Sequence, residues 1–387
     1  MTFDKNRGSA YADIVNRICE TGPISFEEFM EIALYSRNGY YSGHTSFGTH
    51  GDFYTSPSLH PVFGYLFAVQ IINIWESMNR PNSFAVVEIG AGDGTLGIDI
   101  VSAIRSVDAS ILNCIEYIAI DRVPRGAVSG TEIISGDQLD LQIADLESCV
   151  VLSNELIDAL PVEILEVKDR RTNFVMINVD ENGDFKESLI ETTIDEFADV
   201  DLSALEGYRG PLCRKLGESI PTVIDSIPKA VFINVDYGYE QTEYMSMPKS
   251  NRLLQTYYKH VDTLNPLDRV GDQDITAHVN FTALRKVFAQ RGIKSVTNMT
   301  QREWLFGLGY LDVLENMRLS GELSRREISL VDRLVEIDGL GGFRVEISQK
   351  GLDEAEISIL SDGSNSHNCF NKVPPVTRNH MAYHFRV

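Results

Sequence analysis

A glycine-rich turn in residues 84–100, FAVVEIGAGDGTLGIDI, follows a run of apolar residues and precedes a stretch with helical periodicity. Several nucleotide cofactors are bound by a strand, turn and helix of this kind. A dinucleotide fingerprint needs a third glycine where this chain has Thr95, so that pattern is not met. A P-loop is excluded because no Gly-Lys-Ser/Thr follows the strand. What remains is an acidic residue, an apolar residue and three alternate glycines, Gly90, Gly92 and Gly94.

This pattern resembles the first motif of class I methyltransferases, which bind S-adenosylmethionine (SAM). SAM carries a cationic sulfonium and an amino-acid end, and it has no pyrophosphate to lie over a helix N-terminus. Glu88, at the end of the predicted strand, can accept hydrogen bonds from the ammonium group, directly or through water. Gly90 and Gly92 let the backbone approach the cofactor because they carry no Cβ. We therefore predict that Glu88, Gly90 and Gly92 bind SAM.

Two further carboxylates follow the next two predicted strands. Asp121 ends EYIAID (116–121), where it is placed to accept both ribose hydroxyls. Asp137 lies in SGDQLDL (135–141), where methyltransferases of this class often contact the adenine amine. The turn and both aspartates in this order predict SAM as the cofactor. The alternatives are a flavodoxin-like sheet with ordinary turns and an NAD-dependent oxidoreductase, and Thr95 counts against the second.

The segment SNELIDALP (153–161) ends the fourth predicted strand and begins a short helix. Asn154, Glu155 and Asp158 are predicted to face the cleft beside the reactive methyl, because ligands bind at the C-terminal ends of such strands. Their carboxylates can hold a cationic guanidinium or amine, and positioning supplies much of the rate of methyl transfer. We predict that all three are catalytic and that Asn154 also contacts the cofactor. The alternative is structural, with Asn154 capping the helix and Asp158 forming an ion pair elsewhere.

A single histidine is the other candidate for acid–base chemistry. The fifth predicted strand ends in Asp236 and Tyr237, near the same mouth, and His278 lies in the polar loop QDITAHVNF (273–281). His278 can act as a general base for an O–H or N–H nucleophile. The alternative is a structural histidine whose hydrogen bonds are satisfied. No metal is expected, because the early histidines lack the spacing of a metal-binding set: His44, His50 and His60.

The loop GDFYTSPSLHPVFG (51–64) precedes the cofactor strand and is rich in aromatic and hydroxyl residues. Loops of this kind often close over a ligand and exclude water. We predict that Gly51, Asp52, Phe53 and Thr55 contact the cofactor as part of a lid, and that Tyr40 and Tyr41, in the loop before them, help to close it. The alternative is a plain connecting loop.

Short apolar runs alternate with helical stretches from residue 84 onward, which indicates an α/β fold with a parallel sheet. Residues 162–180 are predicted to form a strand pair with a polar turn. The expected regions are an N-terminal helical and lid-loop extension, a core with an acidic, helix-rich insertion, and a polar, loosely packed C-terminal tail. Their bounds are 1–80 for the extension, 81–350 for the core, about 183–229 for the insertion and 351–387 for the tail.

The chain has 387 residues, of which 43% are hydrophobic, as is ordinary for a globular protein. Acidic residues outnumber Lys and Arg by 56 to 34, a formal charge of −22. Nucleic acid is therefore not an expected partner, because duplex binding needs basic surface. We expect no membrane partner, since no run of about 18 apolar residues exists, and a cytoplasmic location, since no targeting segment is evident. The five cysteines are odd in number and far apart, which favours free thiols.

Six segments resemble, in order, those of the MidA family of SAM-dependent methyltransferases, which includes a mitochondrial complex I assembly factor. They lie between about residues 24 and 345 and are FEEFMEIALYSRNGYY, GDFYTSPSLHPVFG, VVEIGAGDGTLGIDI, SNELIDALPVEIL, DYGYE and GDQDITAHVNFTAL. The resemblance implies a Rossmann-like class I methyltransferase core with an N-terminal helical and loop extension and an inserted helical subdomain. It also implies that the GDFYTSP loop lies at the cofactor, and it gives some grounds for a homodimer.

The acceptor of the methyl group stays open at this point. The resemblance implies a nitrogen or oxygen acceptor in a protein or peptide, with arginine as one candidate, and a small metabolite is the other possibility. The acidity of the chain favours a cationic acceptor. Departures from the family pattern count against arginine more than against SAM: Ser58, Leu59 and His60 after TSP, Tyr65 after FG, and Lys259 where an arginine is expected. The alternative function is a non-catalytic assembly or interaction protein that binds SAM.

Overall fold

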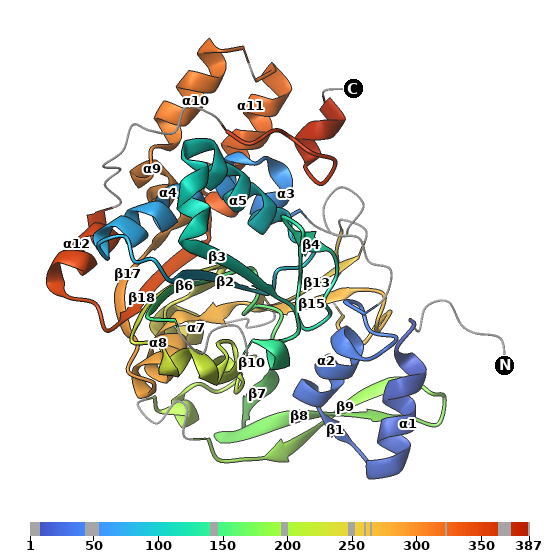
Figure 1. Cartoon of the computed structure of the whole chain (residues 1–387). Helices are drawn as coiled ribbons and strands as arrows, with labels where there is room; N and C mark the ends of the chain where they lie inside the picture. Colours follow the sequence, from blue (N-terminus) through green and yellow to red (C-terminus); the bar gives the residue numbers. More distant parts are fainter. Residues whose placement is uncertain are drawn as a thin grey trace.

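The computed structural model describes residues 8–42, 54–139, 146–194, 200–246, 252–258, 261–263, 265–321, 323–362 and 373–385. A six-stranded sheet lies at the centre, in the order β17-β18-β11-β6-β2-β3 (Figure 1). The strands β3, β2, β6 and β11 are parallel, whereas β18 is antiparallel to both β11 and β17. The bounds are Phe84–Ile89 (β2), Ile115–Ile120 (β3), Ser148–Asn154 (β6), Lys229–Asp236 (β11), Lys294–Thr300 (β17) and Arg344–Lys350 (β18).

The central parallel strands end at matched positions. Ile89 of β2 pairs with Ile120 of β3 and with Ser153 of β6. The chain therefore leaves these strands at one edge of the sheet, immediately before Gly90 and Asp121. This is the edge at which open parallel sheets bind ligands, and the α/β prediction is confirmed.

Alternate strand residues pack into two separate cores. Val86 of β2 belongs to the core beneath α4 (Val62–Ser77) and α5 (Thr95–Val107), whereas Val87 belongs to the core beneath α8 (Phe281–Gln290). Strands that are covered on both faces are apolar without alternation. That is why the run FAVVEI predicts a buried strand.

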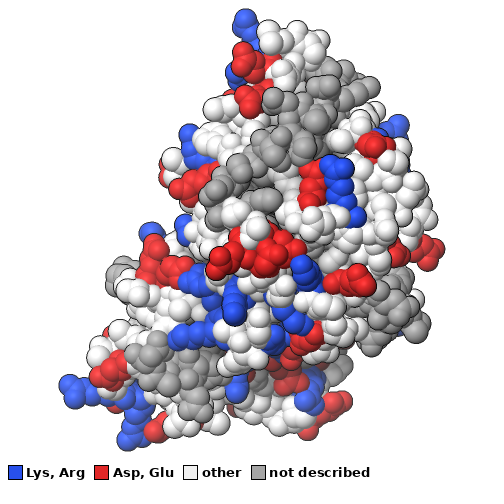
Figure 2. Space-filling view, turned by 60° about the vertical axis from the view of Figure 1, so that its left-hand side comes forward, with Lys and Arg blue, Asp and Glu red and all other residues white. Residues whose placement is uncertain are grey.

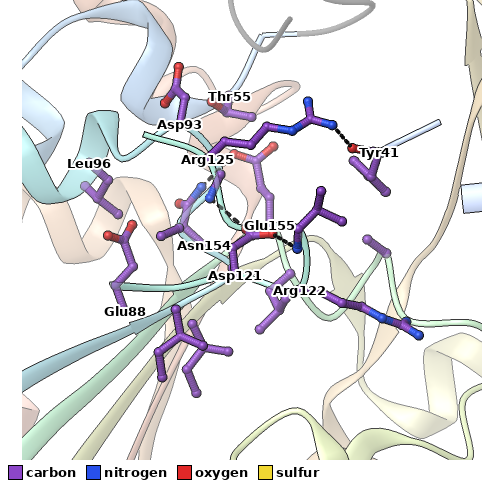
Figure 3. A pocket seen from close by; sticks show the side chains of 18 of the residues that line it. Tyr41, Thr55, Glu88, Asp93, Leu96, Asp121, Arg122, Arg125, Asn154 and Glu155 are labelled. Atoms are coloured by element: carbon purple, nitrogen blue, oxygen red, sulfur yellow. Dashed lines mark hydrogen bonds between the residues drawn. The ribbon is translucent and has the colours of Figure 1, made fainter. Parts of the chain in front are cut away.

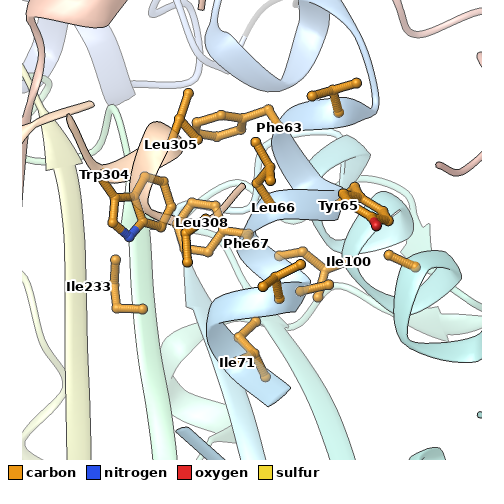
Figure 4. Packing of buried hydrophobic residues seen from close by; sticks show 14 of the residues in the cluster. Phe63, Tyr65, Leu66, Phe67, Ile71, Ile100, Ile233, Trp304, Leu305 and Leu308 are labelled. Atoms are coloured by element: carbon orange, nitrogen blue, oxygen red, sulfur yellow. The ribbon is translucent and has the colours of Figure 1, made fainter. Parts of the chain in front are cut away.

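Trp304 of α9 (Gln301–Gly307) is buried in the larger core, where it lies beside Phe67 (Figure 4). Its ring lies 4.8 Å from that of Phe67 and 6.2 Å from that of Phe63, in edge-on arrangements. Such pairs add about 0.5–1.5 kcal/mol to the free energy of area burial. Trp304 Nε1 donates a hydrogen bond of 3.3 Å to Gln70 Oε1, so the indole N–H is paired. These contacts join α4 to the C-terminal half of the chain.

A second sheet lies beside the first and carries the N-terminal helices (Figure 1). Its strands are β1 (Ile24–Ser25), β7 (Glu163–Lys168), β8 (Arg171–Val179), β9 (Phe185–Glu191) and β10 (Arg209–Leu212), and α1 (Tyr11–Thr21) and α2 (Phe26–Tyr35) pack on it. The predicted strand pair in residues 162–180 is present as β7 and β8. The predicted helix-rich insertion is different, because its described residues form β9, β10 and short 3-10 turns. The side chains of β9 are largely exposed, so the hydrophobic pattern gave no strand signal.

The C-terminal region differs from the predicted loose tail. α12 (Glu354–Asp362) packs on α4 and β17, and Val373 and Ala382 are 7% and 0% exposed. A few apolar side chains in a polar sequence therefore suffice to anchor it. Two helices, α10 (Tyr310–Leu319) and α11 (Arg325–Asp332), lie on the same side of the sheet.

The remaining elements are short. They are α3 (Ser56–Leu59), β4 (Ala127–Val128), β5 (Thr131–Glu132), β12 (Gly238–Tyr239), α7 (Gln241–Ser246), β13 (Leu254–Tyr258), β14 (Val261–Thr263), β15 (Asp274–Ala277), β16 (Val279–Asn280), and the 3-10 turns η2 (Ala109–Asn113), η3 (Gly136–Gln138), η4 (Leu202–Ala204), η5 (Leu216–Glu218), η6 (Thr222–Ser226), η8 (Arg333–Val335), η9 (Leu340–Gly342) and η10 (Met381–Phe385). No helix in the described ranges combines the length and apolarity needed to cross a bilayer. Figure 2 shows Lys and Arg gathered on one face beneath a band of Asp and Glu, although the net charge is −22.

Candidate functional site

A cavity of about 360 Å³ opens at the edge where β2, β3 and β6 end (Figure 3). The ends of those strands and the loops after them line it, together with the α3 region that carries Thr55 and the end of α2 with the loop after it. Gly136 of η3 and Glu218 of η5 also contribute to the lining. Several predicted residues are thereby brought together from distant parts of the sequence: Thr55, Glu88, Gly90, Gly92, Asp121, Asn154, Glu155 and Asp158.

The glycine turn between β2 and α5 adopts backbone conformations that favour glycine. Gly90 and Gly92 have φ angles of +76° and +57°. A Cβ on Gly90 would lie 2.8 Å from Leu156 Cδ1, so a larger residue would collide with the wall of the cavity. Asp93 Oδ1 accepts a 3.0 Å hydrogen bond from Thr95 N, which fixes the first turn of α5. The turn is therefore narrow and rigid beside the cavity.

Asp121 is held by the backbone on both of its carboxylate oxygens. Oδ2 accepts a hydrogen bond of 2.9 Å from Gly92 N, and Oδ1 accepts one of 2.8 Å from Val123 N. Burial raises the pKa of the Asp121 carboxyl, although these N–H groups oppose the shift. Each oxygen keeps a second lone pair, so this carboxylate can still accept the two hydroxyls of a ribose.

Glu88 lies at the floor of the cavity and is 3% exposed. Its Oε2 accepts a 2.9 Å hydrogen bond from the Tyr117 hydroxyl. Burial raises the pKa of Glu88 to about 8. A cation next to this carboxyl would favour its ionised form, which suits the predicted contact with an ammonium group.

The side chains of Asn154 and Glu155 are hydrogen-bonded to each other at the end of β6. Asn154 Nδ2 donates a 3.0 Å hydrogen bond to Glu155 Oε1, and the same oxygen accepts one of 3.3 Å from Ser56 N (Figure 3 shows the first). Because the amide N–H₂ is directed at Glu155, Asn154 Oδ1 is the atom left to accept, and within the described residues it is buried without a partner. The ammonium of SAM would supply the missing donor, so these residues fit the cofactor.

Glu155 also has an unusual backbone conformation, with φ at +52°. Few non-glycine residues adopt this region, and such strain is concentrated at functional sites. Burial and the nearby Asp158 raise the pKa of Glu155 to about 8. Its carboxyl contacts the start of α3, so it holds the segment that carries Thr55 against the strand end.

Asp158 is fixed by Asp236, which the sequence places near the same mouth. Asp236 Oδ2 accepts hydrogen bonds of 2.9 Å from Ile157 N and 3.2 Å from Asp158 N. Asp158 is 5% exposed, Tyr237 hydrogen-bonds its side chain, and burial raises its pKa. Asp158 Oδ1 has no hydrogen-bond partner among the described residues. The predicted pair of carboxylates, Glu155 and Asp158, is therefore present at the cavity, with different surroundings.

Two tyrosines and two arginines form one wall of the cavity, and of these four residues the sequence predicted Tyr41, as part of the lid. The rings of Tyr35 and Tyr41 stack at 5.4 Å, and the Tyr35 hydroxyl donates a 2.8 Å hydrogen bond to the Ala159 carbonyl. Arg122 lies over the Tyr35 ring, and Arg125 Nη2 donates a 2.6 Å hydrogen bond to the Tyr41 carbonyl (Figure 3). The signal in the sequence for the two arginines is DRVPR (121–125), in which Arg122 directly follows Asp121.

His278 does not line the cavity. It lies at a smaller pocket, where its ring stacks on Tyr239 at 5.2 Å and its Nδ1 is 3.3 Å from the Leu253 carbonyl. Burial lowers the pKa of His278 to about 4. This placement favours the structural alternative over the predicted general base.

Some predicted residues cannot be placed in the same way. Gly51, Asp52 and Phe53 lie outside the described residues, and so does the side chain of Asp137. Gly136, next to Asp137 in η3, does line the cavity. Thr55 and Tyr41 are therefore the predicted lid residues that the structure describes at the cavity.

Comparison with known proteins supports the cofactor that the geometry of the cavity fits. Residues 66–299 match a family model described as "Putative S-adenosyl-L-methionine-dependent methyltransferase". A solved structure of a COG1565 superfamily member from Burkholderia thailandensis, bound to S-adenosyl-homocysteine, is 25% identical with a TM-score of 0.75, covering 90% of this chain and 94% of that one.

Curated relatives agree with this match. The mitochondrial protein arginine methyltransferase NDUFAF7 homolog of Drosophila melanogaster is 26% identical, covering 75% of this chain and 72% of the relative. Human mitochondrial protein arginine methyltransferase NDUFAF7 is 24% identical, covering 76% and 72%. Because these relatives are named as mitochondrial proteins, the predicted cytoplasmic location is contradicted. The family match, the relatives and the cavity together identify the chain as a SAM-dependent methyltransferase that belongs to the MidA-like family.

Proposed function

We propose that this methyltransferase transfers the methyl group of SAM to a guanidinium nitrogen of an arginine residue in a protein. The observation that carries the proposal is Asp158, whose Oδ1 is buried at the cavity without a hydrogen-bond partner among the described residues. A buried carboxylate oxygen without a donor is costly, and a guanidinium N–H would supply one. The curated relatives are named protein arginine methyltransferases, which supports the same acceptor.

The departures from the family pattern weigh little against arginine. Leu59 and His60 are 0% exposed and Tyr65 is 2% exposed, so these side chains pack in the protein interior. His60 Nδ1 accepts a 3.2 Å hydrogen bond from Val62 N within its own turn. Of this group Ser58 lines the cavity, and Lys259 lies outside the described residues. The argument that these departures make against an arginine acceptor therefore loses most of its basis.

The residues that line the cavity would have separate roles in binding the cofactor, binding the acceptor and positioning. SAM supplies an electrophilic methyl group when bound; Asp121 would hold the ribose, and Glu88 with Asn154 would hold the ammonium. Asp158 would accept a guanidinium N–H and take up the proton that the nitrogen loses. Its position is fixed because Asp236 binds the N–H groups of Ile157 and Asp158. Glu155 would act by positioning Asn154 and the start of α3 rather than by touching the acceptor.

We also infer how the fold divides into a core, an extension and an inserted part. The central sheet would be a class I methyltransferase core, α1 and α2 an N-terminal extension, and the strands β7 to β10 the inserted part. The sheet order and the turn after β2 support this assignment.

The homodimer stays a prediction, and sedimentation of the purified protein would test it. A mitochondrial location, inferred from the relatives' names, is checked by cell fractionation.

The test compares Asp158→Asn with Asp312→Asn, an exposed aspartate on α10. Each variant is incubated with SAM and an arginine-containing peptide, and a matched peptide with lysine replaces it in parallel. We expect Asp158→Asn to lower methylation of the arginine peptide by about 100-fold or more, the usual effect of losing a positioned acid–base group. SAM affinity, measured by calorimetry, should stay within about threefold of wild type.

Three results would contradict the proposal. Equal rates for Asp158→Asn and wild type would remove Asp158 from the reaction. Methylation of the lysine peptide alone would exclude arginine as the acceptor. SAM binding with no methylation of peptides, metabolites or mitochondrial extract proteins would favour the non-catalytic assembly protein instead.

A further inference from the structure

The C-terminal segment 373–385, which we call the strap, reaches back to the helix that follows the cofactor turn. Val373 and Ala382 are buried in the larger core, and η10 packs against α11 and α3. Figure 1 shows this segment in red beside α11. The strap therefore touches both α3, next to Thr55, and the side of the sheet that carries α5.

The first contact of the strap with α5 is a buried pair, His380 and Asp99. His380 Nε2 lies 2.8 Å from Asp99 Oδ2, and both side chains are almost fully buried. His380 Nδ1 accepts a 2.9 Å hydrogen bond from Thr377 N, which can only donate. Nδ1 therefore carries no proton, so Nε2–H is the donor to Asp99. The strap itself sets the tautomer of His380, because Thr377 N donates to Nδ1, and so Nε2–H is the donor to the Asp99 carboxylate.

The second contact reaches the cavity wall. Asn379 Nδ2 donates a 3.0 Å hydrogen bond to Thr95 Oγ1. Thr95 is the first residue of α5, lines the cavity and is 6% exposed. Because Thr95 Oγ1 accepts from Asn379, the hydroxyl keeps its own proton for another acceptor. The carboxylate at the amino-acid end of SAM is an acceptor of the right kind.

We propose that the strap positions the first turn of α5 for SAM, with Asn379 orienting the Thr95 hydroxyl and His380 anchoring the segment on Asp99. Asn379 and His380 are thus positioning residues for cofactor binding, far in sequence from every motif of the site. The same role explains why a polar C-terminal segment is packed on the cofactor side of the sheet. It rests on SAM binding and is independent of the identity of the acceptor.

The experiment uses the full chain and measures SAM affinity by calorimetry without an acceptor. The variant is Asn379→Ala, and the control is the neighbouring Arg378→Ala, whose side chain is exposed. Losing one hydrogen bond to an oriented hydroxyl should weaken SAM binding by about 3- to 10-fold. Arg378→Ala should bind SAM as wild type does. Urea unfolding of both variants without SAM should match wild type, which separates positioning from stability.

A double-mutant cycle with Thr95→Val tests whether Asn379 acts through the Thr95 hydroxyl. In the Thr95→Val background, Asn379→Ala should have no further effect on SAM affinity. At saturating SAM the Asn379→Ala enzyme should keep its kcat, with a higher KM for SAM and an unchanged KM for the acceptor. Wild-type SAM affinity of Asn379→Ala, or an equal loss with and without the Thr95 hydroxyl, would overturn the proposal.

Discussion

Replacing Glu155 with Gln removes the ionisable group of this buried side chain and keeps its hydrogen bonds. Glu155 Oε1 accepts hydrogen bonds from Ser56 N and Asn154 Nδ2, and glutamine offers the same acceptor atom in the same place. The substitution therefore keeps both contacts and removes the titrating group. Burial and the neighbouring Asp158 raise the pKa of Glu155 from 4.5 to about 8.

The sign of the effect follows from proton linkage. Between a pH of 4.5 and about 8, the folded protein holds a proton on Glu155 that the unfolded chain has released. Its stability therefore falls as the pH rises through this window, and the loss is complete above the folded pKa. At about 1.36 kcal/mol for each pKa unit, the shift amounts to roughly 3–5 kcal/mol, the lower figure allowing for partial exposure of the side chain. Glutamine has no proton to release, so the variant avoids this loss.

Urea unfolding, followed by the fluorescence of Trp75 and Trp304, measures the difference directly. Relative to wild type, Glu155→Gln should gain about 1 kcal/mol or less near pH 5 and roughly 3–5 kcal/mol near pH 9. Glu315→Gln, on the exposed face of α10, is the control for general charge effects. A gain that differs by less than about 0.5 kcal/mol between the two pH values would refute the reasoning.

Two further substitutions test the cofactor site and the core. Asp121→Asn should weaken SAM binding by about 10-fold or more, because the amide has one acceptor oxygen and would turn its N–H₂ toward Gly92 N or Val123 N; calorimetry giving a wild-type Kd would contradict the ribose assignment. Trp304→Ala should lower the free energy of unfolding by about 3–5 kcal/mol, since the ring is buried against Phe67 and pairs with Gln70. Urea unfolding followed by circular dichroism measures this loss, and a loss below about 1 kcal/mol would show that the core closes around the gap.

The part of the site that follows directly from buried strands could be predicted from the sequence. Glu88, Asp121 and Asn154 each lie at the end of an apolar run, and parallel pairing brings such ends to one edge. The glycine turn was predictable for the same local reason, since its φ angles require residues without a Cβ. Local pattern and sheet topology agree at these positions, so one supports the other.

The rest of the site depends on contacts between segments that are far apart in the sequence. Tyr35 is hydrogen-bonded to Ala159, and Asn379 is hydrogen-bonded to Thr95. No spacing of residues in the sequence predicts either pair. The sequence left two roles open for His278, a general base and a structural histidine, and its ring is stacked on Tyr239 at a pocket away from the cavity, which favours the second. Side-chain direction at the end of a loop is set by tertiary packing, which composition does not encode.

The charge of the cavity explains more about its ligands than the charge of the whole chain does. Its described lining residues include two that are basic, and both are engaged: Arg122 pairs with Glu31, and Arg125 donates to the Tyr41 carbonyl. These arginines therefore bind residues of the N-terminal segment, Glu31 and Tyr41, and are not available to pair with an anionic ligand. The acidic lining residues are more numerous: Glu88, Asp93, Asp121, Glu155, Asp158 and Glu218. Burial raises the pKa of Glu88 and of Glu155 to about 8, so these two carboxyls ionise near neutral pH when a cation lies beside them.

A net charge of −22 says little by itself, since Figure 2 shows Lys and Arg gathered directly beside Asp and Glu on one face. Inside a concave site the sign of the lining is concentrated by the low-dielectric walls. A lining with this excess of acid favours cations, and SAM brings two of them, its sulfonium and its ammonium. A guanidinium acceptor fits the same field, whereas an anionic acceptor would meet Asp158 and Glu218 with no free cation among the described lining residues to balance them. The electrostatics of the cavity thus favour the same acceptor as the unpaired oxygen of Asp158.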